Sequence, residues 1–134
     1  MSADSRHVSV VIAASPDAVY DYASDPARLP EWAAGLAGGI RKDAEGRWIA
    51  DSPFGVVEVR FVPRNELRVL DHEVITPDGT VFFNPMRVVP AGDSAEVIFT
   101  VRRHDGMTIE QLDADAAAVA ADLESLRGKV EGQL

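Results

Sequence analysis

Residues 108–131 constrain the fold of this chain more than any other stretch of its sequence. Their apolar residues recur at intervals of three and four, which places them on one face of a single long helix. At 1.5 Å per residue, this helix is roughly 36 Å long. Such a stripe must be covered by the rest of the chain. Its members are Ile109, Leu112, Ala116, Val119, Leu123, Leu126 and Val130.

Both ends of this helix carry recognisable signals. Thr108 is suited to cap the first turn, and Gln111, three residues later, completes a capping box. Gly128 weakens the last turn, and Gly132 is a suitable stop. The sequence therefore predicts a helix that begins after Thr108 and ends near Gly132.

Nearly everything before this helix is predicted to form strands and turns. A first strand is expected at residues 6–13, followed by two short helices at 16–24 and 26–34 with a break or kink at Pro30. Runs of alternating apolar residues, separated by turn residues such as Pro77-Asp78-Gly79, then predict an antiparallel meander. Its strands are expected at 39–42, 47–51, 55–62, 66–76, 80–89 and 95–104.

Length and composition indicate one globular domain, residues 1–134, with an apolar fraction of 46%. The chain has no cysteine, which excludes disulfides and is compatible with a cytoplasmic location. No apolar run is long enough for a membrane span. The net charge of −9 repels phosphate backbones, so nucleic acid is not an expected partner. Both a monomer and a homodimer remain open.

Short stretches of the sequence and the order of the predicted elements both resemble a known superfamily. Residues 15–32, SPDAVYDYASDPARLPEW, resemble the N-terminal signature of the SRPBCC superfamily, which includes START domains, polyketide cyclase/dehydrase-like proteins and the birch pollen allergen. Residues 69–74, 77–79 and 84–88 resemble a polyketide-cyclase-like subgroup that mostly lacks assigned activity.

The resemblance implies an α+β helix-grip fold. In this fold a curved, seven-stranded antiparallel sheet wraps around the last helix, a cavity lies between them, and two short helices close one end. A cystatin-like cone also wraps a sheet around a helix, but its long helices come early in the chain. Here the long helix comes last, which disfavours the cone.

Strand alternation predicts which side chains face the cavity. In 55–62 and 95–104 the apolar faces are clear. In 66–76 the face with fewer carboxylates is expected inside, after a bulge near Arg68, and in 80–89 Arg87 marks the outside. Pro85 cannot donate to a ladder, so that strand is expected at an edge or with a bulge. The inward set is Val57, Val59, Phe61, Leu70, His72, Val74, Phe82, Asn84, Met86, Val88, Val97, Phe99 and Val101.

This inventory is aromatic and aliphatic with few polar groups, which suits an apolar or aromatic small molecule held by one or two hydrogen bonds. His72 and Asn84 are the polar candidates. Trp32 and Phe54 are expected near the mouth. The predicted ligand-binding residues are Trp32, Phe54, Phe61, His72, Phe82, Asn84, Met86 and Phe99.

Each candidate has a structural alternative. His72 could be a core histidine bonded to a neighbour, and Asn84 could bond the backbone at a bulge. Trp32 could be a packing anchor between helix and sheet, and Met86 could simply fill a gap. The inward side chains could also fill the cavity.

Several kinds of chemistry have no support in the sequence. His7, His72 and His104 do not have the spacing of metal ligands, so neither zinc nor another cofactor is predicted. There is no glycine-rich phosphate loop and no nucleophile elbow. His104-Asp105, at the end of a strand, is a weak candidate pair, because polar residues are common at strand ends.

Three functions remain, in this order. The first is a small-molecule binding protein without chemistry of its own. The second, implied by the resemblance, is a cyclase or dehydratase acting on a polyketide-like substrate, with His72 as the acid/base and Asn84 as an orienting donor. The third is a protein-interaction module, which a flat exposed apolar patch would favour.

Overall fold

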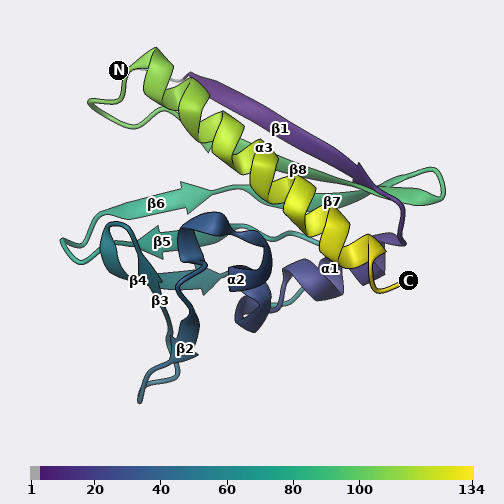
Figure 1. The fold of residues 1–134 in the computed structure, drawn as a ribbon, viewed down its shortest axis with the longest axis horizontal. Coiled ribbons are helices and arrows are strands. Elements are labelled where there is room, and N and C mark those ends of the chain that lie inside the picture. Colours follow the sequence, from purple (N-terminus) through teal and green to yellow (C-terminus); the bar gives the residue numbers. More distant parts are fainter. Residues whose placement is uncertain (1–3) are drawn as a thin grey trace.

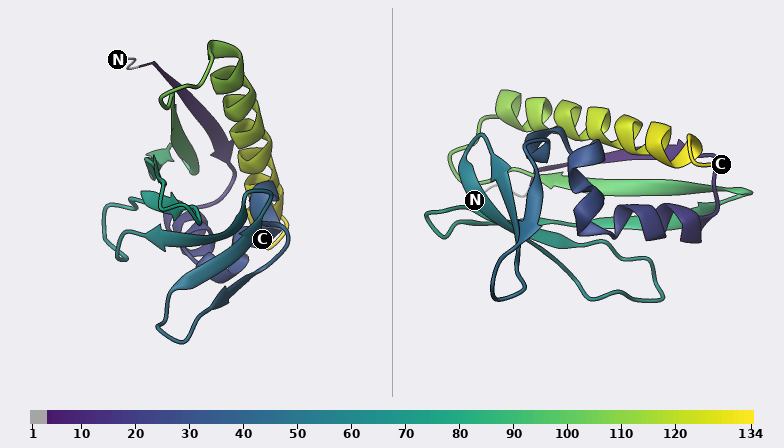
Figure 2. Two further views of the ribbon diagram at one scale, coloured as in Figure 1. Left: turned by 90° about the vertical axis from the view of Figure 1, so that its left-hand side faces the viewer. Right: turned by 60° about the horizontal axis from the view of Figure 1, so that its bottom comes forward.

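The long helix α3 (Ile109–Glu131) lies in the palm of a bent antiparallel sheet (Figures 1 and 2). The structure is a computed structural model and describes residues 4–134. The α+β class and the helix-grip arrangement predicted from the sequence are confirmed. The predicted capping box is also present, because Thr108 Oγ1 accepts from Gln111 N and Gln111 Oε1 accepts from Thr108 N.

Two groups of hydrogen-bonded strands form the sheet. One has the order β1-β8-β7, and the other has the order β2-β3-β4-β5-β6. All pairings between neighbouring strands are antiparallel. The strands are β1 (Ser5–Ile12), β2 (Ile40–Lys42), β3 (Trp48–Ser52), β4 (Gly55–Phe61), β5 (His72–Ile75), β6 (Val81–Asn84), β7 (Met86–Ala91) and β8 (Ser94–Arg102).

The expected count of seven strands is wrong, because residues 4–134 contain eight. The predicted strand 80–89 is divided at Pro85 into β6 and β7, which belong to different groups. Proline has no N–H to contribute to a ladder, and the pairing with β8 stops at this point. β6 is therefore an edge strand of its group, one of the two positions expected for a strand with this proline.

The predicted strand 66–76 is also shorter than expected, since β5 begins only at His72. Arg68 has a left-handed backbone with φ of 56°, which bends the chain where a bulge was predicted. Beyond the bend, Leu70 N donates to Met86 O at 2.7 Å, so the segment still lies beside β7. The side chain of Asp71 accepts from Met86 N at 2.8 Å and so satisfies the backbone next to the break.

The segment after β1 forms short helices. They are α1 (Pro16–Ala23), α2 (Leu29–Trp32) and two 3-10 turns at Pro26–Arg28 and Ala34–Leu36. The predicted break or kink at Pro30 does not occur. This residue lies in the first turn of α2, where no N–H is needed. Tyr22 Oη donates to Glu31 Oε1 at 2.8 Å and ties α1 to α2.

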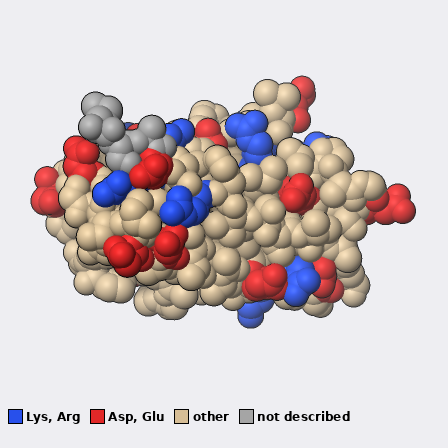
Figure 3. Space-filling model, turned by 90° about the horizontal axis from the view of Figure 1, so that it is seen from above, with Lys and Arg blue, Asp and Glu red and all other residues tan. Residues whose placement is uncertain are grey.

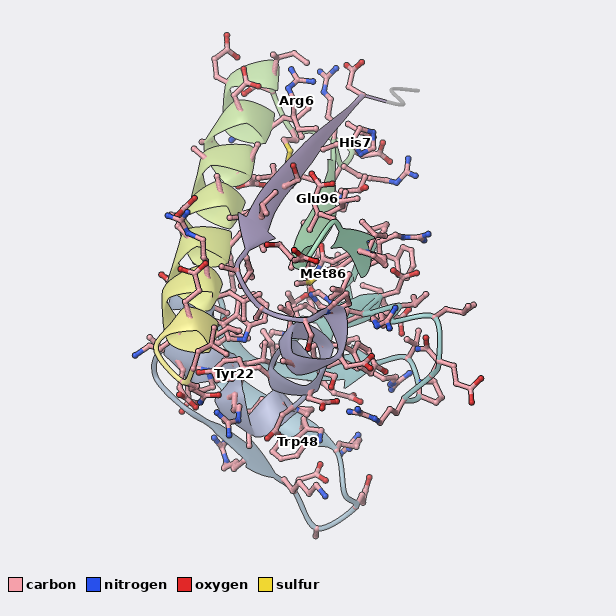
Figure 4. All side chains as sticks on the ribbon, turned by 90° about the vertical axis from the view of Figure 1, so that its right-hand side faces the viewer. Arg6, His7, Tyr22, Trp48, Met86 and Glu96 are labelled. Atoms are coloured by element: carbon pink, nitrogen blue, oxygen red, sulfur yellow. The ribbon has the colours of Figure 1, made fainter. Side chains whose placement is uncertain are left out.

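The apolar stripe of α3 supplies much of the core. Leu112, Leu123, Leu126 and Val130 are buried, whereas Ile109 at the start of the stripe is exposed. α3 runs in the same direction as β1 and is joined to it at both ends. Arg6 Nε donates to Asp113 Oδ1 at 2.9 Å near the start of the helix (Figure 4).

At the other end of α3, Ala13 N donates to Glu131 Oε2 at 2.8 Å. These two contacts fix the register of the helix along β1. α3 therefore fills the part of the palm that lies over β1 and β8, and its other flank faces the second group of strands.

We expect Leu123→Ala to lower the free energy of unfolding by about 2–5 kcal/mol, because Leu123 is 1% exposed and its loss leaves a cavity. Urea unfolding followed by circular dichroism measures the change. Ser125→Ala, an exposed position on the same helix, is the control and should change stability by less than about 0.5 kcal/mol. A loss that small for Leu123→Ala would show that the stripe is not buried.

Candidate functional site

A cleft of about 700 Å³ lies between the N-terminal half of α3 and the strands β4, β5, β6 and β8. It occupies the part of the palm that α3 does not fill. Its walls are mainly apolar and come from both sides, the sheet and the helix. The apolar residues that line it are Leu36, Pro53, Phe54, Val57, Val74, Phe82, Phe99, Val101, Met107, Ala118 and Val119.

The break at Pro85 opens one side of the cleft. Thr100 N donates to Pro85 O at 3.0 Å, and the pairing of β8 with β7 goes no further. Beyond this bond β8 and β6 separate, although His104 still contacts Phe82 with its ring edge-to-face at 4.8 Å between centroids. The space between the two strands thus becomes part of the cleft.

The polar groups of the cleft fall into two classes. The hydroxyls of Ser52 and Thr76 are engaged in their own turns, where they donate to Gly55 O at 2.8 Å and to the Asp78 carboxylate, respectively. Gln111 uses its Oε1 in the helix cap. In contrast, the side chains of Asn84, His104, Asp105 and Asp115 form no hydrogen bond or ion pair within residues 4–134, so they are available to a ligand.

Four of the eight predicted ligand-binding residues line this cleft, namely Phe54, Phe82, Asn84 and Phe99. Phe54 is 81% exposed and stands at the rim in the β3–β4 turn. Asn84 points inward as predicted, and its amide does not bond the backbone beside Pro85, the alternative considered for it. The other four predicted residues, Trp32, Phe61, His72 and Met86, are not part of the lining.

His72 is a buried histidine behind the cleft wall. It is 7% exposed, stacks on Phe61 at 4.8 Å and meets the edge of Phe99 at 5.8 Å. Its Nδ1 lies 2.9 Å from Leu70 O. Because a carbonyl oxygen only accepts, Nδ1 carries the proton. Burial lowers the pKa of His72, partly offset by the bond to Leu70 and by Asp71, so the ring is neutral at pH 7.

Trp32 and Met86 belong to the core, and Met86 is the first residue of β7 (Figure 4). The indole Nε1 of Trp32 is buried and has no hydrogen-bond partner within residues 4–134. Packing therefore accounts for the position of this side chain, as in the alternative considered for it.

Several cleft residues were not predicted from the sequence. The sequence offers His104 only as part of the weak strand-end pair His104-Asp105. Gln111 is predicted only as part of the helix cap, and the carboxylates of the helix, Asp115 among them, are expected mainly opposite its apolar stripe. The spacing of Gln111, Asp115 and Ala118 does place them on one helical row, but the sequence alone does not show that this row faces a cleft.

The row continues along the helix to Asp122, which lies outside the lining of the cleft. Asp122 Oδ1 accepts from Ala34 N at 3.2 Å and holds the turn that carries Leu36 against α3. Partial burial raises the pKa of Asp122, and the bond from Ala34 offsets part of the rise. This contact therefore fixes a turn whose residues Gly35 and Leu36 line the cleft.

The chain matches the family described as polyketide cyclase / dehydrase and lipid transport over residues 5–131. It belongs to this family. The match spans both groups of strands and α3, so the cleft lies entirely within the family domain. The superfamily resemblance predicted from the sequence is confirmed. Comparison with curated proteins gives no match.

Solved structures similar to this family member share its fold at low sequence identity. XoxI from Bacillus cereus has a TM-score of 0.74 at 15% identity and covers 94% of each chain. A START superfamily protein from Mycobacterium smegmatis has a TM-score of 0.69 at 16% identity, and the match covers 97% of this chain and 99% of that protein. Truncated norcoclaurine synthase from Thalictrum flavum has a TM-score of 0.68 at 19% identity, and the match covers 96% of this chain and 94% of that protein.

Two further observations concern membrane crossing and metal binding. No helix within residues 4–134 has the length and hydropathy that crossing a membrane requires. Over the same residues, His, Asp and Glu side chains form no group of three that could hold a metal ion.

We expect His72 to make the protein less stable in mild acid. Its pKa is lowered from about 6.5 in the folded state, so the unfolded chain binds more protons below that pH. The stability is therefore present above pH 6.5 and is lost as the pH falls, by at most about 1.4 kcal/mol per pH unit. In His72→Leu this slope should be reduced.

Urea unfolding between pH 7.5 and 5 measures the slope. His7→Gln is the control, because His7 is exposed and points away from the helix on the other side of β1 (Figure 4). It should keep the slope of the original chain. Equal slopes for the original chain and His72→Leu would contradict the assignment.

Proposed function

We propose that this protein binds a small apolar or aromatic molecule in the cleft between α3 and the sheet. The observation that carries the proposal is the open volume of about 700 Å³ with apolar side chains on opposite walls. Volumes of this size are typical of small-molecule sites, which are mostly apolar and contain a few polar groups that set orientation.

The arrangement of the lining supports a flat ligand. Phe82 and Phe99 come from different strands on the sheet side, and Val119 faces them from the helix. Aromatic rings prefer offset or edge-to-face contacts with other rings. The free amide of Asn84 supplies a donor and an acceptor, and the free ring of His104 supplies one of each when neutral.

The alternative inside the same family is catalysis, a cyclase or dehydratase with His72 as the acid/base. It has weaker support, since the ring lies behind Phe61 and Phe99 and does not line the cleft. Asn84, the orienting donor in this scheme, is the cross-strand partner of His72 and does reach the cleft.

Ala118→Trp is expected to block ligand binding, because residue 118 lines the cleft from α3 and an indole there would occupy the space. Affinity for polycyclic aromatic compounds and sterols, measured by native mass spectrometry and fluorescence titration, should fall by about tenfold or more. Thermal unfolding should be little changed, since the position is exposed.

Ala117→Trp is the matched control, because residue 117 is exposed on the same turn and outside the lining. It should leave affinity as it is. If the unmodified protein binds no apolar compound, or if Ala118→Trp binds as well as Ala117→Trp, the proposal fails.

The catalytic alternative predicts that His72→Gln loses at least about 100-fold in turnover of a poly-β-ketone while still binding it. Under the binding proposal no turnover exists to lose, and the variant binds like the original chain. Product analysis by mass spectrometry, with both proteins at equal occupancy, separates the two functions.

A further inference from the structure

Among the charged residues that line the cleft, the carboxylates outnumber the cations, since Asp105 and Asp115 stand against Arg102 alone. Asp115 on α3 and Asp105 in the loop after β8 both line the cleft. Within residues 4–134 neither carboxylate forms an ion pair or a hydrogen bond. A ligand that enters the cleft therefore meets two carboxylates that no cation within residues 4–134 contacts directly.

Two guanidinium groups at this end of the molecule are already bound to other groups. Arg6 binds Asp113, with 2.9 Å between Nε and Oδ1. Arg103 Nε donates to Met107 O at 2.8 Å, and its Nη1 lies 3.1 Å from Asp4 Oδ2. Arg102 borders the cleft, but strand alternation places its side chain on the exposed face, opposite buried Val101.

This local imbalance is not simply the acidity of the whole surface. The face seen from above in Figure 3 carries acidic and basic side chains close together. Most arginines elsewhere on the described chain have a carboxylate within 4.0 Å, as in Arg47 with Asp43 and Arg64 with Asp21. The cleft differs because its carboxylates lack such a partner.

Aromatic rings at the mouth act in the same direction. Phe54 and Phe82 line the cleft and also an adjoining hollow of about 400 Å³ near the β5–β6 turn. The face of an aromatic ring carries negative electrostatic potential and attracts ammonium groups. Apolar walls also reduce the screening of charges by water.

We propose that the cleft selects its ligand by charge, with Asp115 as the specificity-determining residue. It accepts apolar or aromatic molecules that are neutral or carry an ammonium group. It rejects carboxylates of the same size, including fatty acids. This inference rests on the ligand-binding function proposed above. In the bound state the ammonium group lies at the mouth beside Asp115, and the apolar body lies between Phe82 and Val119.

The test uses two series of matched probes. One is naphthalene carrying an ethanol, an ethylamine or an acetate group, and the other is decanol, decylamine and decanoate. Affinities are measured by isothermal titration calorimetry at pH 7 and at two salt concentrations. The expected order is amine, then alcohol, then carboxylate, with steps of about threefold to fivefold that shrink as salt is raised.

Asp115→Asn removes one charge and keeps the shape of the side chain. It should weaken amine binding by about threefold, strengthen carboxylate binding by a similar factor and leave alcohol binding unchanged. Glu110→Gln removes a charge near the same end of α3 but outside the cleft, and it should change none of the three affinities.

The outcomes separate the two proposals. If the alcohols bind but the three head groups bind equally, or the carboxylates bind best, charge selection is wrong and ligand binding stands. The same holds if Glu110→Gln alters the order as much as Asp115→Asn. If no member of either series binds, the proposed function fails and charge selection fails with it.

Discussion

The burial of one face of α3 against β1 and β8 is the interaction on which the rest of this structure depends. Leu123 and Leu126 are almost fully enclosed, and each buried leucine contributes on the order of 2 kcal/mol. The two polar contacts that join the helix to β1 add little free energy but fix where the helix lies. With the helix held on that side, the other half of the palm is left open, and the cleft results from this asymmetry.

Pro85 gives the cleft its second property, an opening within the sheet itself. A residue with an N–H at this position could continue the ladder between β8 and its neighbour. With proline the ladder ends, β6 and β8 diverge, and Asn84 and His104 are presented to the space between them. The unpaired backbone is partly compensated nearby, where Asp71 binds Met86 N. One local backbone constraint therefore shapes both the sheet and the site.

The fold by itself does not decide what is bound, because proteins with one architecture carry out many functions. The low identity to the solved structures shows a shared backbone, and the chemistry must come from the residues of this chain. These residues divide the cleft into an apolar body and an acidic mouth. The body is the basis of the proposed small-molecule binding, and the carboxylates of Asp105 and Asp115 are the basis of the proposed charge selection.

Periodicity and capping chemistry in the sequence were sufficient for the long helix, its start at Thr108, the inward faces of β4, β5 and β8, and the fold class. These features are local or follow from alternation, so the amino-acid sequence is sufficient to predict them. The tertiary structure alone decided which inward residues reach open space. His72 and Phe82 have the same pattern in the sequence, yet one is covered by Phe61 and the other lines the cleft. It also decided that Asp115 faces the cleft, because the orientation of a helical row depends on how far the helix fills the palm. That orientation is set by packing between residues about 100 positions apart, as in Arg6 and Asp113 with a separation of 107, and local periodicity contains no information on it.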